Sequence, residues 1–174
     1  NIGDYPPYLA FALGAGDTTV LKMTNAYSML VNHGKELKPT IMDYVQTRNG
    51  RVIWPAKWKP CEGCNGKDWD GKAMPRFTPG GKQIIDPITA FQVVHMLEGV
   101  IQRGTATVLK DLDRPLFGKT GTSTGPSNTW FVGGTPNLVA GLYMGYDKQQ
   151  KSMASYVQGG SVAAPIFKQF ARKA

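Results

Sequence analysis

Charged and metal-binding residues are scarce in this sequence of 174 residues. Asp, Glu, Lys and Arg together make up 18% of the chain, and there are only two histidines and two cysteines. A structural zinc site needs four ligands, and both histidines lie far in the sequence from the cysteines. We therefore expect no metal site.

Long runs of basic or of apolar residues are also absent. Lys and Arg outnumber Asp and Glu by 20 to 12, but they are scattered, and no aromatic RNA-binding signature accompanies the net charge of +8. No apolar run reaches the ~20 residues of a membrane-spanning helix. Nucleic acid is therefore not an expected partner, whereas the basic balance suits an anionic surface or substrate.

The chain begins at Asn1, without an initiator methionine or a signal peptide. We expect it to be a piece of a longer protein, so the missing targeting signals do not bear on where that protein resides. The 41% hydrophobic content is enough for one core, and the 21 glycines and 12 prolines indicate many turns. A helical bundle is therefore not expected.

The two cysteines stand in the sequence CEGC (Cys61, Cys64), among Pro, Gly and Trp residues. A redox-active pair would stand at a strand-to-helix junction, which this segment does not resemble. The residues favour a small disulfide that staples a loop in an oxidising compartment, and the role of that loop stays open.

Residues 43–83 are predicted to hold a hairpin and then a long loop. The Asn49-Gly50 pair is the preferred centre of a two-residue turn between β-rich runs at about residues 43–54. The following residues 55–83 are too many for an ordinary connection, so we expect a loop insertion or a lid. We predict that residues 1–174 otherwise form part of a single domain.

Two helices are predicted before residue 105. The first is capped by Asp17, has apolar residues at a spacing of three and four, and is closed by Gly34. The second begins at Asp86-Pro87 and ends at Gly104. Its apolar stripe consists of Ile88, Phe91, Val94, Leu97 and Ile101.

Short β-rich runs separated by short loops follow from Pro115 onward: PLFGKTGT, NTWFVGG and NLVAGLYMGYD. Such spacing favours an antiparallel meander of three strands. A last helix begins at Pro165, and its Ile166 and Phe170 would cover the sheet. The predicted fold class is α+β, an antiparallel sheet flanked by helices.

The segment FGKTGTS contains a Gly-Lys-Thr that is also found in phosphate-binding loops. Such a loop needs a first glycine five residues before the second, and that position is Asp113, whose carboxylate would repel a phosphate. The alternative is a strand in which Lys119 and Gly121 point to one face and Thr120 and Thr122 to the other. Threonine hydroxyls could then hold a carboxylate, and Gly121 would let a substrate backbone approach closely.

Several segments resemble the transpeptidase domain of penicillin-binding proteins, most closely its C-terminal part in the bifunctional class A type. In family order they are LGAGDTTVLKMTNAYSMLVNHGKELKP, NGRVIW, MLEGVIQRGTA, KTGTS, TWFVGGTP, GYD and AAPIFKQF. The resemblance covers nearly the whole chain except the cysteine loop. It implies a serine β-lactamase/D,D-transpeptidase-like fold and an enzyme that cross-links peptidoglycan and is acylated by β-lactams.

The resemblance also implies roles for the residues of the K-T-G strand. Lys119 would adjust the electrostatics near a serine nucleophile, and the backbone N–H of Thr122 would form half of an oxyanion hole. Thr120, Gly121, Thr122 and Ser123 would bind substrate, with Thr120 and Thr122 holding a carboxylate. No cofactor is implied. Thr105 lies in the segment leading to this strand, and the sequence alone gives it no function.

Two departures from the family pattern stand out. Asn128 occupies a position where the family usually has aspartate, so a neutral hydrogen bond would replace an ion pair. No serine is followed by lysine at the third position, and no S-x-N motif occurs, so the nucleophile is not in this chain. We expect the chain alone to be inactive and to require the N-terminal part of the same domain as its partner.

The implied parent protein resides in the bacterial cell envelope, on the periplasmic side of the inner membrane. It would carry a glycosyltransferase domain elsewhere and contact the membrane only through an N-terminal anchor. The implied ligands are peptidoglycan stem peptides and β-lactams. The alternatives are a related D,D-carboxypeptidase or β-lactamase, and a non-catalytic module that binds a peptide or a partner through its threonines.

Overall fold

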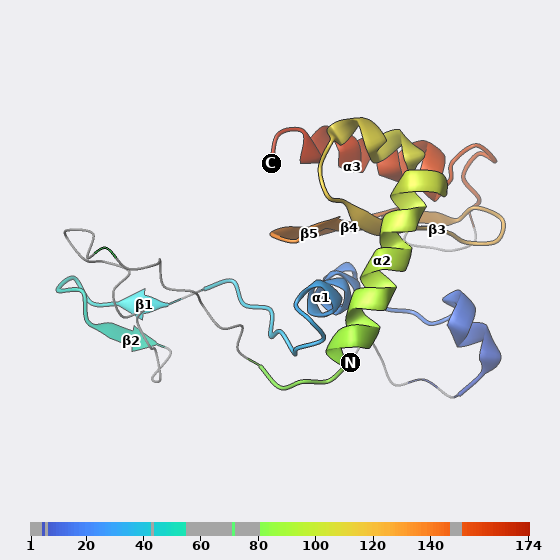
Figure 1. Ribbon diagram of the computed structural model, residues 1–174. Helices are drawn as coiled ribbons and strands as arrows, with labels where there is room; N and C mark the ends of the chain where they lie inside the picture. The colour runs from blue at the N-terminus through green and yellow to red at the C-terminus, as the bar shows by residue number, and fades with distance from the viewer. Residues whose placement is uncertain (1–4, 6, 43, 55–70, 72–80, 147–150) are drawn as a thin grey trace. The chain divides into compact units, whose positions relative to one another are not determined.

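The computed structural model describes residues 5, 7–42, 44–54, 71, 81–146 and 151–174 (Figure 1). The chain divides into two compact units: Asn1–Leu37 together with Lys82–Ala174, and Lys38–Gly81. Cys61, Cys64 and nearly all of the predicted insertion lie outside the described residues, so the disulfide and the insertion stay predictions.

The larger unit is built on a three-stranded antiparallel sheet with the order β3-β4-β5. Its strands are β3 (Phe117–Thr122), β4 (Asn128–Thr135) and β5 (Leu138–Gly145). Each strand follows its predecessor after a short connection, as the spacing of the β-rich runs predicted. The antiparallel meander is therefore confirmed, with β3 at one edge of the sheet.

Helices lie on both faces of this sheet. Figure 1 shows the sheet nearly edge-on, with α3 on one side, α1 on the other and α2 crossing from one side to the other. The helices are α1 (Val20–Val31), α2 (Pro87–Arg103) and α3 (Ala164–Ala171). Three shorter helical turns are η1 (Leu9–Leu13), η2 (Thr107–Leu112) and η3 (Gly159–Ala163), the last a π-helical turn that runs into α3.

The main core lies between the sheet and α3. Phe131 of β4 is fully buried and its ring centroid lies 4.5 Å from that of Phe167. The other buried members of this cluster are Ile101, Ala106, Leu109, Leu116, Ala163, Ala164 and Ala171. Large aromatic rings on the strand and small residues on the helix allow α3 to approach the sheet closely.

The prediction that Ile166 and Phe170 cover the sheet is wrong, because these side chains are 39% and 47% exposed. Phe167 is buried instead, together with alanines three residues before it and four residues after it. These three residues form the stripe of α3 that faces the sheet. The neighbouring stripe, which contains Ile166 and Phe170, therefore faces outward.

The opposite face of the sheet contacts α1 at a glycine. A Cβ atom at Gly141 of β5 would collide with Thr24 Oγ1 and lie 3.0 Å from Val20 Cγ1. Helix α1 therefore approaches the sheet at a point where no side chain intervenes.

The α-helices lie where the sequence predicts them, but both caps of α1 differ, since its C-cap is Asn32 and not Gly34. Thr19, and not Asp17, caps α1, since its Oγ1 accepts a hydrogen bond from Lys22 N at 3.2 Å. Asp86 caps α2 as predicted, accepting hydrogen bonds from the N–H groups of Ile88 and Thr89 at 3.0 Å each.

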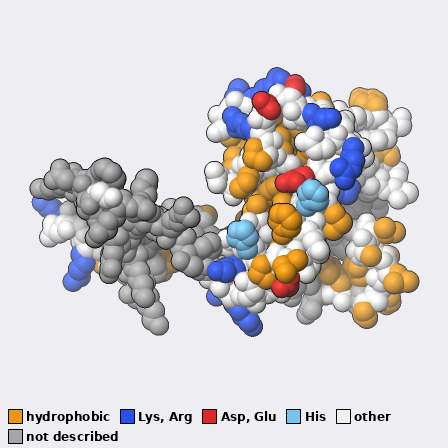
Figure 2. Space-filling view, in the orientation of Figure 1, with side chains coloured by type: hydrophobic (Ala, Val, Ile, Leu, Met, Phe, Trp, Pro, Cys, Tyr) orange, Lys and Arg blue, Asp and Glu red, His pale blue; other side chains and the backbone are white. Residues whose placement is uncertain are grey.

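The apolar stripe predicted for α2 is only partly buried. Ile101, near its end, is 1% exposed, whereas Ile88 and Phe91, near its start, are 69% and 68% exposed. Figure 2 shows hydrophobic side chains at the surface over α2. In its first turns the helix buries the small Ala90 instead.

The smaller unit contains a two-stranded hairpin, β1 (Val45–Gln46) with β2 (Val52–Trp54). The hairpin is confirmed, but its predicted two-residue turn is wrong. That turn needs positive φ at both central residues, and only Gly50 has it, with φ of 81°. The turn is longer, with Gly50 N donating to the Thr47 carbonyl at 2.9 Å.

Candidate active-site strand

Strand β3 carries the K-T-G residues, and within the part of the chain that the structure describes it pairs on one side only, with β4. Its residues Lys119, Thr120, Gly121 and Thr122 stand opposite Val132, Phe131, Trp130 and Thr129, respectively. Thr120 therefore shares the face of Phe131, which packs on α3, and Lys119 shares the other face. The alternation of side chains expected from the sequence is present.

The backbone N–H and C=O groups of β3 also alternate in direction, toward β4 and away from it. Ser123 N donates to the Asn128 carbonyl at 3.2 Å, which makes these two residues a hydrogen-bonded pair. In an antiparallel ladder such pairs alternate with pairs whose N–H and C=O groups point away from the partner strand. The N–H groups of Thr120 and Thr122 are therefore directed to the free edge of β3.

The side chain of Lys119 folds along the same edge. Its Nζ donates a hydrogen bond to the Thr120 carbonyl at 2.9 Å, and the residue is exposed. The positive charge consequently lies beside the outward-directed backbone groups of the strand.

The two threonine hydroxyls contact two other segments of the chain. Thr122 Oγ1 accepts a hydrogen bond from Gly159 N at 3.0 Å. Thr120 Oγ1 lies 2.5 Å from Thr105 Oγ1, on the connection between α2 and η2. Strand β3 is thus tied to the segment before α3 and to the segment after α2.

Gly121 lies over the indole of the neighbouring strand. A Cβ atom there would lie 3.3 Å from Trp130 Cβ. The Gly121 carbonyl accepts a hydrogen bond from Thr129 Oγ1 at 3.2 Å, and Thr129 is fully buried. The hydrogen bond joins the K-T-G strand to β4, and the absence of a side chain at Gly121 leaves room for Trp130.

The hydroxyl of Ser123 is engaged in the turn between β3 and β4. Ser123 Oγ accepts hydrogen bonds from the N–H groups of Ser127 and Asn128 at 3.0 Å each, and it lies 2.9 Å from Ser127 Oγ. These contacts explain why the turn closes at this point. The substrate-binding role of Ser123 stays a prediction.

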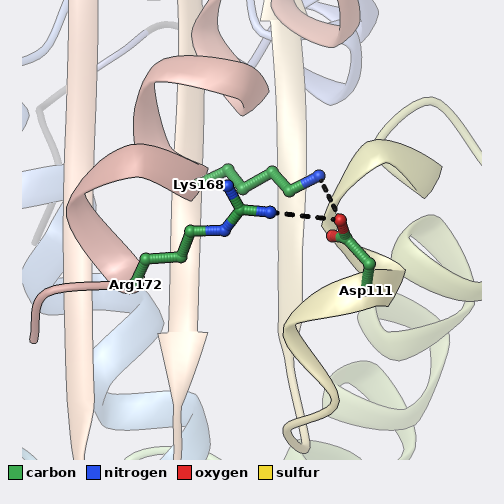
Figure 3. A network of polar contacts seen from close by, with 3 residues as sticks. All are labelled: Asp111, Lys168 and Arg172. Atoms are coloured by element: carbon green, nitrogen blue, oxygen red, sulfur yellow. Dashed lines mark hydrogen bonds and ion pairs between the residues drawn. The ribbon is translucent and has the colours of Figure 1, made fainter.

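An ion-pair network lies on the α3 side of the sheet (Figure 3). Asp111 Oδ2 of η2 lies 2.7 Å from Lys168 Nζ and 3.3 Å from Arg172 Nη2 of the α3 end. The hydrogen bond from Lys168, with the charges of both cations, holds the pKa of Asp111 below its ordinary value of 3.8. This network fastens α3 to η2.

Across the described ranges, no three His, Cys, Asp or Glu side chains are grouped so that they could hold a metal ion. His95 contacts Glu98 across one helical turn at 3.1 Å, and both side chains are exposed. In the same part of the chain, none of the helices has the length and apolar character needed to cross a bilayer.

Comparison with known proteins gives a consistent assignment. The family model of the penicillin binding protein transpeptidase domain matches residues 7–172. Penicillin-binding protein 1A of Rickettsia bellii is 36% identical over 173 residues, covering 98% of this chain and 22% of that protein. Penicillin-binding protein 1A of Neisseria meningitidis is 34% identical over 170 residues, covering 97% and 19%.

Solved structures of such proteins share the fold. Penicillin-binding protein 1A from Haemophilus influenzae superposes with a TM-score of 0.75 at 23% identity, covering 97% of this chain and 28% of that one. PonA1 from Mycobacterium tuberculosis in complex with penicillin V has a TM-score of 0.68 at 25% identity, with coverages of 94% and 40%.

The chain therefore belongs to the penicillin-binding protein transpeptidase domain family. The resemblance to the C-terminal part of that domain in class A proteins is confirmed. The chain spans about a fifth of the length of the curated relatives that it matches, 22% and 19% in the two named.

Three residues that were not predicted lie beside the K-T-G strand or beside one another: Thr105 and Gly159 next to Thr120, and Gly160 next to Thr105. A Cβ atom at Gly159 would lie 2.8 Å from Thr120 Cβ, and one at Gly160 would collide with the Thr105 carbonyl oxygen. The adjacent glycines before the last helix were the available signal in the sequence, because paired glycines often mark a close backbone approach.

Proposed function

We propose that this chain supplies the K-T-G side of the acyl-transfer site in a serine-type peptidoglycan D,D-transpeptidase. The observation that carries this proposal is the edge position of β3. Lys119, Thr120 and Thr122 lie along an unpaired strand edge, and the ladder directs the Thr122 N–H outward. Family membership supplies the reaction class.

Each residue of the K-T-G strand has its own role in this reaction. The hydroxyls of Thr120 and Thr122 bind the C-terminal carboxylate of a D-Ala-D-Ala stem peptide or the carboxylate of a β-lactam. Lys119 provides positive potential beside the nucleophile, and the N–H of Thr122 donates to the oxyanion that forms at the attacked carbonyl. Gly121 leaves room for the substrate backbone.

The serine itself comes from the part of the domain that precedes this chain in the parent protein. Its Oγ attacks the carbonyl of the penultimate D-alanine, the C–N bond breaks, and the terminal D-alanine leaves after gaining a proton. An amine of a neighbouring stem peptide then attacks the acyl-enzyme, loses a proton and releases the serine. This chain alone forms no acyl-enzyme.

The parent protein acts in the bacterial cell envelope, on the periplasmic side of the inner membrane. Its ligands are peptidoglycan stem peptides and β-lactams, and a glycosyltransferase domain lies elsewhere in it. The penicillin V bound to PonA1 supports the β-lactam part of this proposal.

Intact-mass spectrometry with and without penicillin V tests the proposal. The parent protein should gain the mass of the antibiotic, and the 174-residue chain by itself should not. Thr120→Val or Thr122→Val in the parent should slow acylation by about 10- to 100-fold, because each removes a hydrogen bond to a charged group. Thr107→Val, the same change at an exposed threonine of η2, is the matched control and should acylate normally.

A parent protein that gains no mass would contradict the transpeptidase proposal. The absence of an S-x-x-K motif in this chain would then favour a non-catalytic module that binds peptide carboxylates. A carboxypeptidase or β-lactamase would be acylated too, but its products would come from attack by water rather than by an amine.

A further inference from the structure

Thr105 contacts the K-T-G strand although it is fifteen residues away from it in sequence. It stands just after α2, and its Oγ1 lies 2.5 Å from Thr120 Oγ1. This distance is at the short end of the range for hydrogen bonds between hydroxyls. The proposed function uses Thr120 and gives Thr105 no role.

The backbone around Thr105 is firmly held. The N–H groups of Gly104 and Ala106 both donate to the Val100 carbonyl at 3.2 Å, and Ala106 is fully buried. On its other side, Gly160 fits against the Thr105 carbonyl so closely that a Cβ atom would collide with it. The hydroxyl of Thr105 is therefore presented from a fixed position, which lowers the entropic cost of its hydrogen bond.

The neighbouring hydroxyl of the strand is fixed in a similar way. Thr122 Oγ1 accepts from Gly159 N, and a Cβ atom at Gly159 would lie 2.8 Å from Thr120 Cβ. The segment before α3 thus limits where both threonine side chains of β3 can lie.

The number of O–H protons in the Thr105–Thr120 pair determines which hydroxyl can donate to a ligand. Thr105 and Thr120 carry one O–H proton each, and one of the two is used between the oxygens. A carboxylate bound by Thr120 accepts the other, which requires that Thr105 donates to Thr120 and Thr120 donates to the ligand. Donation into Thr120 also strengthens its own donation to an anion.

We propose that Thr105 is a positioning residue for the carboxylate-binding site, which orients the Thr120 hydroxyl toward the carboxylate of the substrate or β-lactam. This inference rests on the proposed function. It adds Thr105, a residue outside the K-T-G strand, to that function. Thr105 would affect only the binding of the charged carboxylate and not the reaction at the carbonyl.

The test compares two ligands in the parent protein: penicillin V and its methyl ester, which lacks the carboxylate charge. Thr105→Val removes the hydroxyl and keeps the side-chain shape. It should slow acylation by penicillin V by about 5- to 10-fold, the effect of one lost hydrogen bond, and slow acylation by the ester less than about 2-fold. Thr105→Ser keeps the hydroxyl and should restore the wild-type rate.

Thr107→Val, the same change at an exposed threonine two residues further on, is the matched control and should leave both rates unchanged. Equal slowing with both ligands would show that Thr105 only supports the strand and would overturn the inference. So would an unchanged rate with penicillin V. If the wild-type parent is not acylated, the proposed function itself fails, whereas a failure confined to the Thr105 variants leaves it standing.

Discussion

At the scale of single residues, Thr129 is the buried polar group that joins β3 to β4. Its hydroxyl donates to the Gly121 carbonyl at 3.2 Å inside a site with no solvent exposure. Thr129→Val keeps the shape and removes this bond, so it should lower the free energy of unfolding by about 1 kcal/mol. Urea denaturation measures the change.

Thr124→Val is the control for this substitution, because Thr124 is exposed in the turn between the same strands. It should change stability by less than about 0.5 kcal/mol. Equal effects of the two variants would mean that the buried hydrogen bond contributes nothing beyond the general cost of the substitution.

The strand positions of the K-T-G residues could be predicted from the sequence, because side-chain alternation in a strand is a local property. The contact between Thr105 and Thr120 could not. It depends on the direction in which the chain leaves α2 and on the close fit of Gly160, and both are set by tertiary packing. Local sequence patterns carry no information on the direction of the chain after α2 or on the close fit of Gly160.

At the scale of elements, α3 presents one phenylalanine to the sheet and another to solvent. Phe167 is 4% exposed and packs on Phe131, whereas Phe170 is 47% exposed. Phe167→Ala should lower the free energy of unfolding by about 3–5 kcal/mol, because it leaves a cavity in the core. Phe170→Ala, on the same helix, should cost less than about 1.5 kcal/mol.

Chemical denaturation of both α3 variants distinguishes this arrangement from the one predicted by sequence. A larger loss for Phe170→Ala would mean that the helix is rotated. The sequence misled here because both stripes of this short helix are apolar, and only the small alanines flanking Phe167 allow the close approach that buries it.

The Asp111 network makes the attachment of α3 dependent on pH. Its pKa is lowered in the folded protein, so the unfolded chain binds a proton at higher pH than the folded chain does. The stabilisation is complete above the ordinary value of 3.8 and is lost as the pH falls through the lowered value. The effect is small, because Asp111 is exposed and salt screens it.

Asp111→Asn should therefore be less stable than wild type at pH 6, and the two proteins should converge in stability near pH 2. Urea unfolding at these pH values, at low and high salt, measures the difference. Asp113→Asn is the matched control, since asparagine tolerates the left-handed backbone at this exposed position, where φ is 49°. A gap between wild type and Asp111→Asn that persists unchanged at pH 2 would contradict the ion-pair explanation.

At the scale of the whole molecule, large apolar side chains are exposed on α2 and η1. Ile88 and Phe91 are more than two-thirds exposed, and Leu9 and Leu13 are each 93% exposed. Exposed apolar surface of this kind favours association. We expect the isolated chain to self-associate, and the double substitution Ile88→Glu with Phe91→Glu to reduce this.

Light scattering coupled to size-exclusion chromatography measures the association at several concentrations. Lys110→Glu alone introduces an acidic residue at an exposed position outside this surface, lowers the net charge by the same two units and so controls for net charge. A wild-type chain that stays monomeric at high concentration would contradict the expectation.

The strands, the three α-helices and their order along the chain could be predicted, because caps, turns and β-rich runs are signals carried by short segments. The short turns η1, η2 and η3 were not predicted. The exposure of the first turns of α2 could not, since an apolar stripe indicates which face a helix would bury but not whether a neighbour is there to cover it. Ile88 and Phe91 show that limit directly.

The sheet order also has a consequence for how the chain folds. Strands β3, β4 and β5 follow one another along the chain and pair in that order, so each pairing closes only a short loop. Helix α1 reaches β5 from more than a hundred residues earlier, where Thr24 meets Gly141. Contacts of low sequence separation form faster, so the meander should assemble first and α1 should dock onto an existing sheet.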